Sequence, residues 1–259
     1  MRPGVAAGHP ATAAVGAEVL ADGGTAADAV VAMALASCVA ETVMSGLLAG
    51  CHAIVFDGSR VMNLDGFAAV PAGKGDLAEL PIPFGDELVV YAIGPASCAV
   101  PGLPAALGEL WERLGRLPWT RLCEPALALA RTGVRLPEMH ARTLEMLGEL
   151  FSLERGADLF ARNGGVLGEG DVLDQPGLVQ TLEAIAEEGA ESVYRGSIAE
   201  SLLRVDGIVR GPRPSGSPRR ALGAPGQAPV DASLRAGSCA RAHGRPAARD
   251  ARPVARDAR

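Results

Sequence analysis

Aromatic residues are scarce in this chain, at 3% of its 259 residues, although 48% of the residues are hydrophobic. A chain of this length can bury one sizeable core, and that core must be built mainly from alanine, valine and leucine. Lysine is nearly absent as well, since Lys74 is the single lysine beside 23 arginines. We attribute this preference to a GC-rich coding sequence rather than to a function.

The sequence signatures of disulfide, metal and nucleotide sites are missing. The five cysteines are odd in number and widely spaced without a CxxC pair, which predicts reduced, mostly buried thiols. The four histidines lack metal-ligand spacing, and no phosphate-binding glycine loop occurs. We therefore expect no metal and no cofactor. Cys98 with His52 could form a thiol–imidazole pair, but the apolar run around Cys98 favours a core position.

Signals for membrane insertion or secretion are absent too. The apolar run at residues 30–39 is too short and too rich in alanine for a membrane span. The N-terminus has no charged region followed by an apolar stretch. We expect a cytoplasmic protein that does not bind membranes.

Helical spacing first appears at residues 10–22, where apolar side chains recur three and four positions apart. The glycine pair that follows can end this helix. Thr25 then suits the N-cap of a second helix, and Asp28 resembles the acidic member of a capping box. The second helix, at about residues 25–41, is apolar on nearly every side, which predicts that it is buried.

A β-hairpin is predicted next, from strand-like residues 52–56 and 60–64 with the turn pair Asp57-Gly58 between them. A third strand is expected at residues 89–93. Further helices are predicted at residues 103–115, 121–133, 137–150, 176–189 and 197–204.

The composition changes after Asp206. Up to that residue acidic side chains outnumber basic ones by 27 to 13, whereas residues 207–259 carry 11 arginines, 3 acids and no aromatic residue. Such a segment buries too little apolar surface to fold, so we expect one domain at residues 1–206 and a disordered basic tail at residues 207–259. A nucleic-acid-binding arm is less favoured, because lysine and aromatic residues are absent from it. A shifted reading frame is a third interpretation.

Several motifs stand in order along the first 205 residues. They are Gly-Gly-Thr-Ala-Ala-Asp-Ala-Val at 23–30, the run at 41–50, Leu-Asp-Gly at 64–66 with Pro71, Val-Pro-Gly at 100–102, and the helix patterns at 117–130 and 175–196. Together they resemble the N-terminal part of the large subunit of the gamma-glutamyltranspeptidase (gamma-glutamyltransferase) family.

The resemblance implies an α+β fold that is mostly helical in this portion, as an incomplete four-layer αββα N-terminal nucleophile hydrolase. In that family a precursor cuts itself, and the new N-terminal threonine of the small subunit attacks a glutathione-like gamma-glutamyl donor. No threonine here lies in such a cleavage motif, so we expect no catalytic residue and no activity without a small (catalytic) subunit as partner. The alternative is a non-catalytic remnant, or a large subunit whose small subunit is separately encoded. We also expect helices such as the one at 25–41 to expose apolar surface, since the central strands come largely from the other half.

The resemblance places substrate-binding residues at Gly66, Phe67, Ser45 and Gly46. In the family, the residue after Leu-Asp-Gly is usually an arginine that grips the alpha-carboxylate of the acyl donor, and here it is Phe67. Phenylalanine cannot form the two parallel hydrogen bonds of a guanidinium, so we expect a less charged acyl donor. The alternative is that Arg60 serves instead. Ser45-Gly46 resembles the glycine-rich stretch beside the site, and a plain helix-to-strand loop is an equally favoured interpretation.

Overall fold

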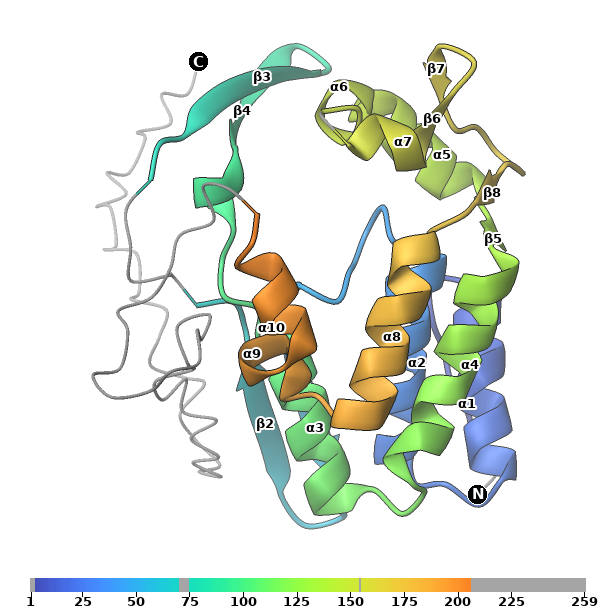
Figure 1. Cartoon of the computed structure of the whole chain (residues 1–259). Coiled ribbons are helices and arrows are strands. Elements are labelled where there is room, and N and C mark those ends of the chain that lie inside the picture. Colours follow the sequence, from blue (N-terminus) through green and yellow to red (C-terminus); the bar gives the residue numbers. More distant parts are fainter. Residues whose placement is uncertain (1–2, 70–74, 154, 206–259) are drawn as a thin grey trace, which may run out of the picture.

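The structure is a computed structural model that describes residues 3–69, 75–153 and 155–205. Within these residues the chain is mixed helix and strand and mostly helical, as expected, and the strands pair two by two (Figure 1). The predicted basic tail, residues 207–259, and the nucleic-acid-binding interpretation attached to it lie outside the described residues.

Two N-terminal helices form the centre of the core. α1 spans Pro10–Ala21 and α2 spans Ala26–Ala40, close to their predicted bounds. α2 packs against α1, α3 and α4, and Ala26 and Val30 are its only exposed residues. The burial predicted for this helix is confirmed. The apolar surface that it was expected to expose is limited to those two residues, because three neighbouring helices of the same chain cover the rest.

The predicted capping box at the start of α2 is present. Thr25 Oγ1 accepts a hydrogen bond from the Asp28 N–H at 3.1 Å, and Asp28 Oδ2 accepts one from the Thr25 N–H at 2.8 Å. Asp28 is fully buried. Its carboxylate also accepts hydrogen bonds from the N–H groups of Arg116 and Leu117, which follow α3. One carboxylate thus caps α2 and anchors the turn after α3.

Three longer helices complete the main core, namely α3 (Leu103–Leu114), α4 (Trp119–Thr132) and α8 (Pro176–Glu188). α4 packs against both α2 and α8, and the three helices are seen together in Figure 1. The Trp119 Nε1 donates a hydrogen bond to the carbonyl oxygen of Ile185 at 2.8 Å, which ties α4 to α8. The short helices α9 (Ser192–Arg195) and α10 (Ser197–Leu202) follow. α9 was not predicted, because four residues are too few to show helical spacing.

A smaller hydrophobic cluster lies beyond α4. The single helix predicted at 137–150 is divided at Leu147 into α5 (Glu138–Met146) and α6 (Gly148–Phe151), and α7 (Gly156–Phe160) follows. Two short strand pairs complete the region: β5 (Val134–Arg135) with β8 (Val172–Leu173), and β6 (Ala161–Arg162) with β7 (Gly165–Val166). The buried residues of this cluster are Val43, Leu136, Leu144, Phe160, Leu167 and Leu173.

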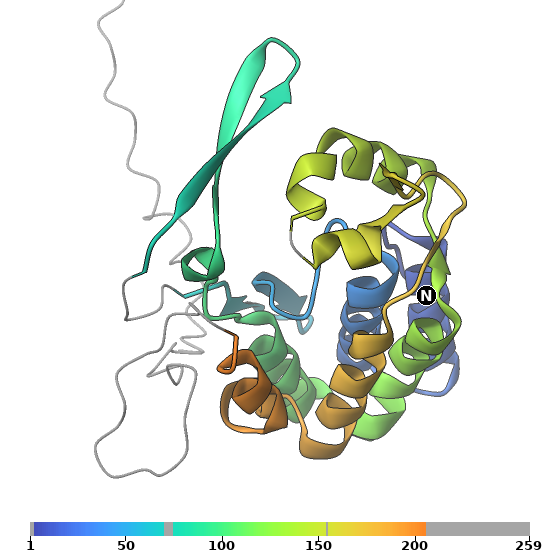
Figure 2. The same ribbon diagram turned by 45° about the horizontal axis from the view of Figure 1, so that its top comes forward.

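Two longer hairpins carry the remaining strands. β1 (Cys51–Phe56) pairs with β2 (Val61–Gly66), and β3 (Ala78–Phe84) pairs with β4 (Glu87–Ile93). β4 contains the strand predicted at 89–93, whereas β3 was not predicted. Its Pro81 and Pro83 lack N–H groups, and a strand with one free edge tolerates them. The β3–β4 hairpin projects from the helices in both views (Figures 1 and 2).

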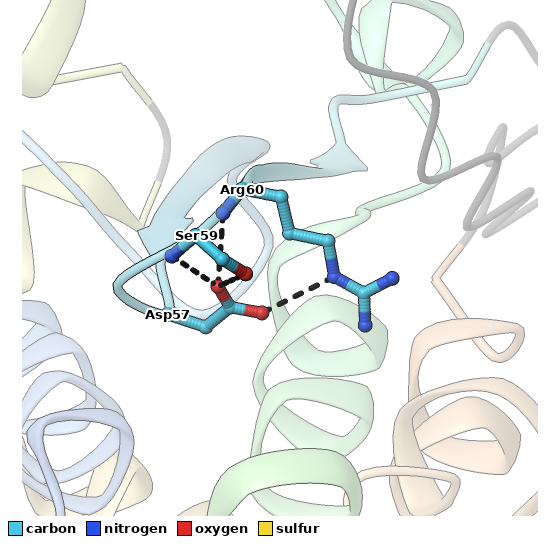
Figure 3. A network of polar contacts seen from close by, with 3 residues as sticks. All are labelled: Asp57, Ser59 and Arg60. Atoms are coloured by element: carbon cyan, nitrogen blue, oxygen red, sulfur yellow. Dashed lines mark hydrogen bonds and ion pairs between the residues drawn. The ribbon is translucent and has the colours of Figure 1, made fainter.

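The turn of the first hairpin is longer than the predicted pair of residues. Asp57 Oδ1 accepts hydrogen bonds from the N–H groups of Ser59 and Arg60, each at 2.9 Å (Figure 3). Four residues therefore connect the strands, with a further hydrogen bond from the Asp57 N–H to the Arg60 carbonyl oxygen at 3.2 Å, and His52 comes to face Asp65 across the hairpin. A two-residue turn at Asp57-Gly58 would instead pair Phe56 with Ser59 and shift every cross-strand pair by two positions.

Each strand pair is a separate two-stranded sheet within the described residues. The four-layer sandwich implied by the resemblance therefore stays a prediction, while the mixed architecture is observed. Among the helices that the structure describes, none combines the length and the apolar character needed to cross a membrane.

Candidate functional site

Gly66 and Phe67 lie where the first hairpin meets the start of α3. Gly66 ends β2 and is buried, and a methyl group on it would press against Ala106 and lie 3.0 Å from the carbonyl oxygen of Gly102. A side chain on Gly102 would in turn meet the carbonyl oxygens of Gly66 and Phe67. The two glycines thus allow the backbone after β2 to touch the backbone before α3.

The loop between α2 and β1 reaches the same point. A side chain on Gly50 would lie 3.0 Å from the Phe67 Cα, so this loop passes directly against Phe67. The carbonyl oxygen of Ala49 accepts hydrogen bonds from the N–H groups of Gly102, at 3.2 Å, and Leu103, at 3.0 Å. These donors at the start of α3 would otherwise lack a partner within the helix. Loop, hairpin and helix are therefore fixed to one another.

Tyr194 holds this junction from the other side. Its hydroxyl donates a hydrogen bond to the carbonyl oxygen of Pro101 at 2.8 Å and accepts one from the Ala105 N–H at 3.1 Å. Burial raises the pKa of Tyr194 to about 12, so the hydroxyl keeps its proton. α9 is thereby anchored to the start of α3.

Phe67 presents its ring to solvent. The residue is 66% exposed, and its N–H donates a hydrogen bond to Asp65 Oδ1 at 3.1 Å. The ring stacks on the imidazole of His52, with the ring centroids 5.9 Å apart and the planes inclined by 16°. His52 Nδ1 lies 3.6 Å from Asp65 Oδ1. We call His52, Asp65 and Phe67 the hairpin-end cluster.

Ser45 and Gly46 lie in the middle of the same loop. The hydroxyl oxygen of Ser45 is 3.5 Å from that of Ser37 on α2, and space is open around Gly46. Further along, Leu47 and Leu48 line a mainly apolar cavity of about 770 Å³ between α8 and α10. The structure thus brings Gly66 and Phe67 together with Gly50, while Ser45 is directed toward α2.

Arg60 does not fit as a substitute for the missing arginine. It lies at the turn of the hairpin, whereas Phe67 follows the opposite end, and β2, with 6 residues, separates them by roughly 20 Å. Its Nε donates a hydrogen bond to Asp57 Oδ2 at 3.1 Å (Figure 3). Hydrogen bonds from the backbone of Arg60 and then of Ser59 lower the pKa of the Asp57 carboxyl. Arg60 therefore belongs to the turn.

The cysteines are only partly as predicted. Cys38 and Cys123 are buried and free, and burial raises the pKa of each thiol to about 12. Cys51 is half-buried. Cys98 is exposed, which contradicts the predicted core position, because it follows a short 3-10 turn at the base of the projecting hairpin. His52 stacks on Phe67, so the thiol–imidazole pair with Cys98 is not observed.

Several threonine hydroxyls of the helical region form local hydrogen bonds. Thr42, Thr143 and Thr181 donate hydrogen bonds to carbonyl oxygens three or four residues earlier in their own chain segments, a common side-chain-to-backbone arrangement. Within the described residues no group of three or more histidine, cysteine or acidic side chains is placed to hold a metal ion.

Residues 12–206 match the family model described as gamma-glutamyltranspeptidase. Glutathione hydrolase 3 of Arabidopsis thaliana is 34% identical over 204 residues, which cover 77% of this chain and 31% of the plant protein. The glutathione hydrolase proenzyme of Bacillus subtilis (strain 168) is 32% identical over 206 residues, which cover 76% of this chain and 34% of the bacterial protein. Acylase ACY 1 proenzyme of Pseudomonas sp. (strain SE83) is 32% identical over 209 residues, with 76% and 37% coverage. The chain spans about a third of the length of these relatives.

Solved structures agree with these similarities. The gamma-glutamyltranspeptidase of Helicobacter pylori superposes with a TM-score of 0.67 at 26% identity, over 77% of this chain and 58% of that one. A cephalosporin acylase from Bacillus halodurans superposes with a TM-score of 0.64 at 29% identity, over 75% and 37% of the two chains. The fold described above is therefore shared with a gamma-glutamyltranspeptidase and with a cephalosporin acylase.

Proposed function

Because the chain belongs to the gamma-glutamyltranspeptidase family, we propose that it is the acyl-donor-binding portion of an N-terminal nucleophile hydrolase or acyltransferase. The reaction transfers an acyl group from a glutathione-like gamma-glutamyl donor, or a related amide, to water or an amine. The nucleophile is the N-terminal threonine of a small catalytic subunit, whose own amino group can act as the base. The relatives support this choice, since they are named as glutathione hydrolases and an acylase.

The choice of acyl donor rests on Phe67. It occupies the position at which the family usually has an arginine, and its ring is exposed beside the glycine-bounded junction. A guanidinium binds a carboxylate through two charge-assisted hydrogen bonds, and a phenyl ring forms neither. We therefore assign to this protein, at neutral pH, an acyl donor less charged than a gamma-glutamyl group.

The exposed face of the first hairpin supports a subunit partner. Ile54, Phe56 and Val61 are 74%, 67% and 53% exposed, and they lie on the same face of the hairpin as the hairpin-end cluster. Adjacent exposed apolar side chains of this kind mark protein interfaces. In this proposal the small subunit covers that face and brings its threonine to the donor beside Phe67.

Complementation tests this function. The chain is co-expressed with the small subunit of the Bacillus subtilis relative, and the product is the complemented enzyme. Two p-nitroanilides are compared at about pH 7.5: gamma-glutamyl, and butanoyl, which is the same acyl chain without the alpha-amino and alpha-carboxylate groups. We expect a stable complex that hydrolyses the butanoyl substrate faster, while the chain alone hydrolyses neither.

Two results would count against the proposal. A complex that forms but hydrolyses neither anilide would favour the non-catalytic remnant. A complex that prefers the gamma-glutamyl substrate would contradict the assignment of a less charged donor, even though the family chemistry would stand.

A further inference from the structure

We propose that His52 is a specificity-determining residue that recognises a carboxylate on the acyl donor when its imidazole is protonated. In this role it replaces the arginine whose position Phe67 holds. The inference rests on the proposed function, because it assigns a residue of the same donor site. The predicted ligand is an amide whose acyl chain ends in a single carboxylate, bound on acidification and rejected at neutral pH.

The geometry of the hairpin places His52 at the right point. Successive side chains of a strand point to opposite faces, so Asp65 and Phe67 share a face, and His52 lies directly opposite Asp65 in the register. The His52 ring is 5.9 Å from the Phe67 ring, and half of its side-chain surface is exposed. Because Nδ1 faces Asp65, Nε2 on the other side of the ring is the nitrogen available to a ligand.

The chemistry of the imidazole differs from that of a guanidinium in two respects. A guanidinium remains charged at every physiological pH and binds a carboxylate through two bonds. An imidazole offers one N–H from each nitrogen, and its charge changes between about pH 5 and pH 8. When His52 is neutral, Asp65 leaves the hairpin-end cluster with a negative charge that repels a carboxylate. Protonation cancels that charge and supplies a donor.

The surroundings of His52 contain few other titrating groups. Asp65 on β2 faces it, and the next positions on the same face, Ile54 and Asn63, do not titrate. The neighbouring Cys51 is half-buried, and burial together with the Asp65 charge raises the pKa of its thiol, so that it stays neutral. α3 packs on the opposite face, where Gly66 meets Ala106. Among the described residues on this face of the hairpin, His52 is thus the only imidazole and Asp65 the only carboxylate.

Binding to the full chain tests the inference without the catalytic subunit. The probe is 4-carbamoylbutanoate, an amide with a terminal carboxylate, and its matched control is butanamide. Affinity is followed by NMR through the imidazole Cε1–H signals. From about pH 8 to about pH 5.5 the affinity for the probe should rise about tenfold, with a shift of the His52 signal, while the affinity for butanamide stays constant.

Three variants separate charge from shape. His52→Gln keeps an N–H donor without a titrating charge, so the rise with acidification should disappear. Asp65→Asn keeps the oxygen that accepts the Phe67 N–H and removes the competing charge, so the probe should bind more tightly at every pH. Phe67→Arg should bind the probe at both ends of the pH range. All three positions are exposed, and circular dichroism checks that each variant is folded.

A pH-dependent rise that persists in His52→Gln would overturn the inference. The inference would also be overturned if the wild-type chain bound the probe with no shift of the His52 signal. That observation is made on the wild-type chain alone. Different results would overturn the proposed function and the role of His52. A complemented enzyme without turnover would overturn the proposed function and leave pH-dependent binding intact. Turnover whose selectivity has the same pH profile in wild type and His52→Gln would overturn the role of His52 alone.

Discussion

His140 lies on α5, close to the N-terminal segment and to the loop that follows α2. The residue is 5% exposed, and its Nδ1 has no hydrogen-bond partner within the part of the chain that the structure describes. Its ring stacks on His9, with the centroids 6.4 Å apart. Burial lowers the pKa of His140 below the ordinary value of 6.5, while the charge of Glu41 raises it and His9 lowers it. The folded protein therefore holds this imidazole neutral.

Acidification should destabilise the fold through His140. The unfolded chain takes up the proton near pH 6.5, whereas the folded chain resists it to lower pH. The free energy of unfolding should therefore fall between about pH 7.5 and pH 5.5, by at most about 1.4 kcal/mol per pH unit for this one proton. His140→Leu should remove that contribution. Urea denaturation at both pH values measures it, and an unchanged slope in the variant would exclude His140 as the cause.

At the scale of elements, the contact between β2 and α3 depends on Gly66 and Gly102. Gly102→Ala would drive a methyl group into the carbonyl oxygens of Gly66 and Phe67, and backbone oxygens cannot turn aside as a side chain can. We expect a loss of stability of about 1–3 kcal/mol. The matched control is Gly46→Ala, which meets open space and should change stability by less than about 0.5 kcal/mol. If urea denaturation showed equal losses of stability in Gly102→Ala and Gly46→Ala, the close contact between the β2 and α3 backbones would not be what Gly102 provides.

The helices of the main core were predictable because their sequence signals are local. The apolar spacing of α1 and α8 and the capping box of Thr25 and Asp28 all lie within a few residues. β3 was missed because its two prolines argue against a strand. α9 and the division between α5 and α6 were missed because single turns carry no periodicity.

The candidate site was predictable only in part. The motif Leu-Asp-Gly marked Gly66 as a match to the family pattern and Phe67 as a departure from it, but nothing in the sequence paired Phe67 with His52. That pair depends on the register of the first hairpin, which the side chain of Asp57 sets through its bonds to the turn. A two-residue turn at Asp57-Gly58 would have moved His52 away from Asp65.

At the scale of the whole molecule, a closed helical core carries hairpins whose apolar faces are left open. α2 is covered by its neighbours, whereas Leu88 and Val90 of the projecting hairpin are 68% and 56% exposed. Large apolar side chains are thus exposed on both hairpins, whereas Val30 is the only one exposed on α2, where such exposure was expected. This distribution fits the proposal that a second subunit covers the exposed face of the first hairpin.

The role of Phe67 is decided by a ratio of two rates in the complemented enzyme. The ratio is kcat/KM for gamma-glutamyl-p-nitroanilide divided by kcat/KM for butanoyl-p-nitroanilide, at about pH 7.5. Phe67→Arg restores a bidentate partner for the alpha-carboxylate, and the ratio should rise by about tenfold or more. A ratio that does not change, or a wild-type enzyme that already favours the gamma-glutamyl substrate, would contradict the assignment of Phe67 as the residue that selects a less charged donor.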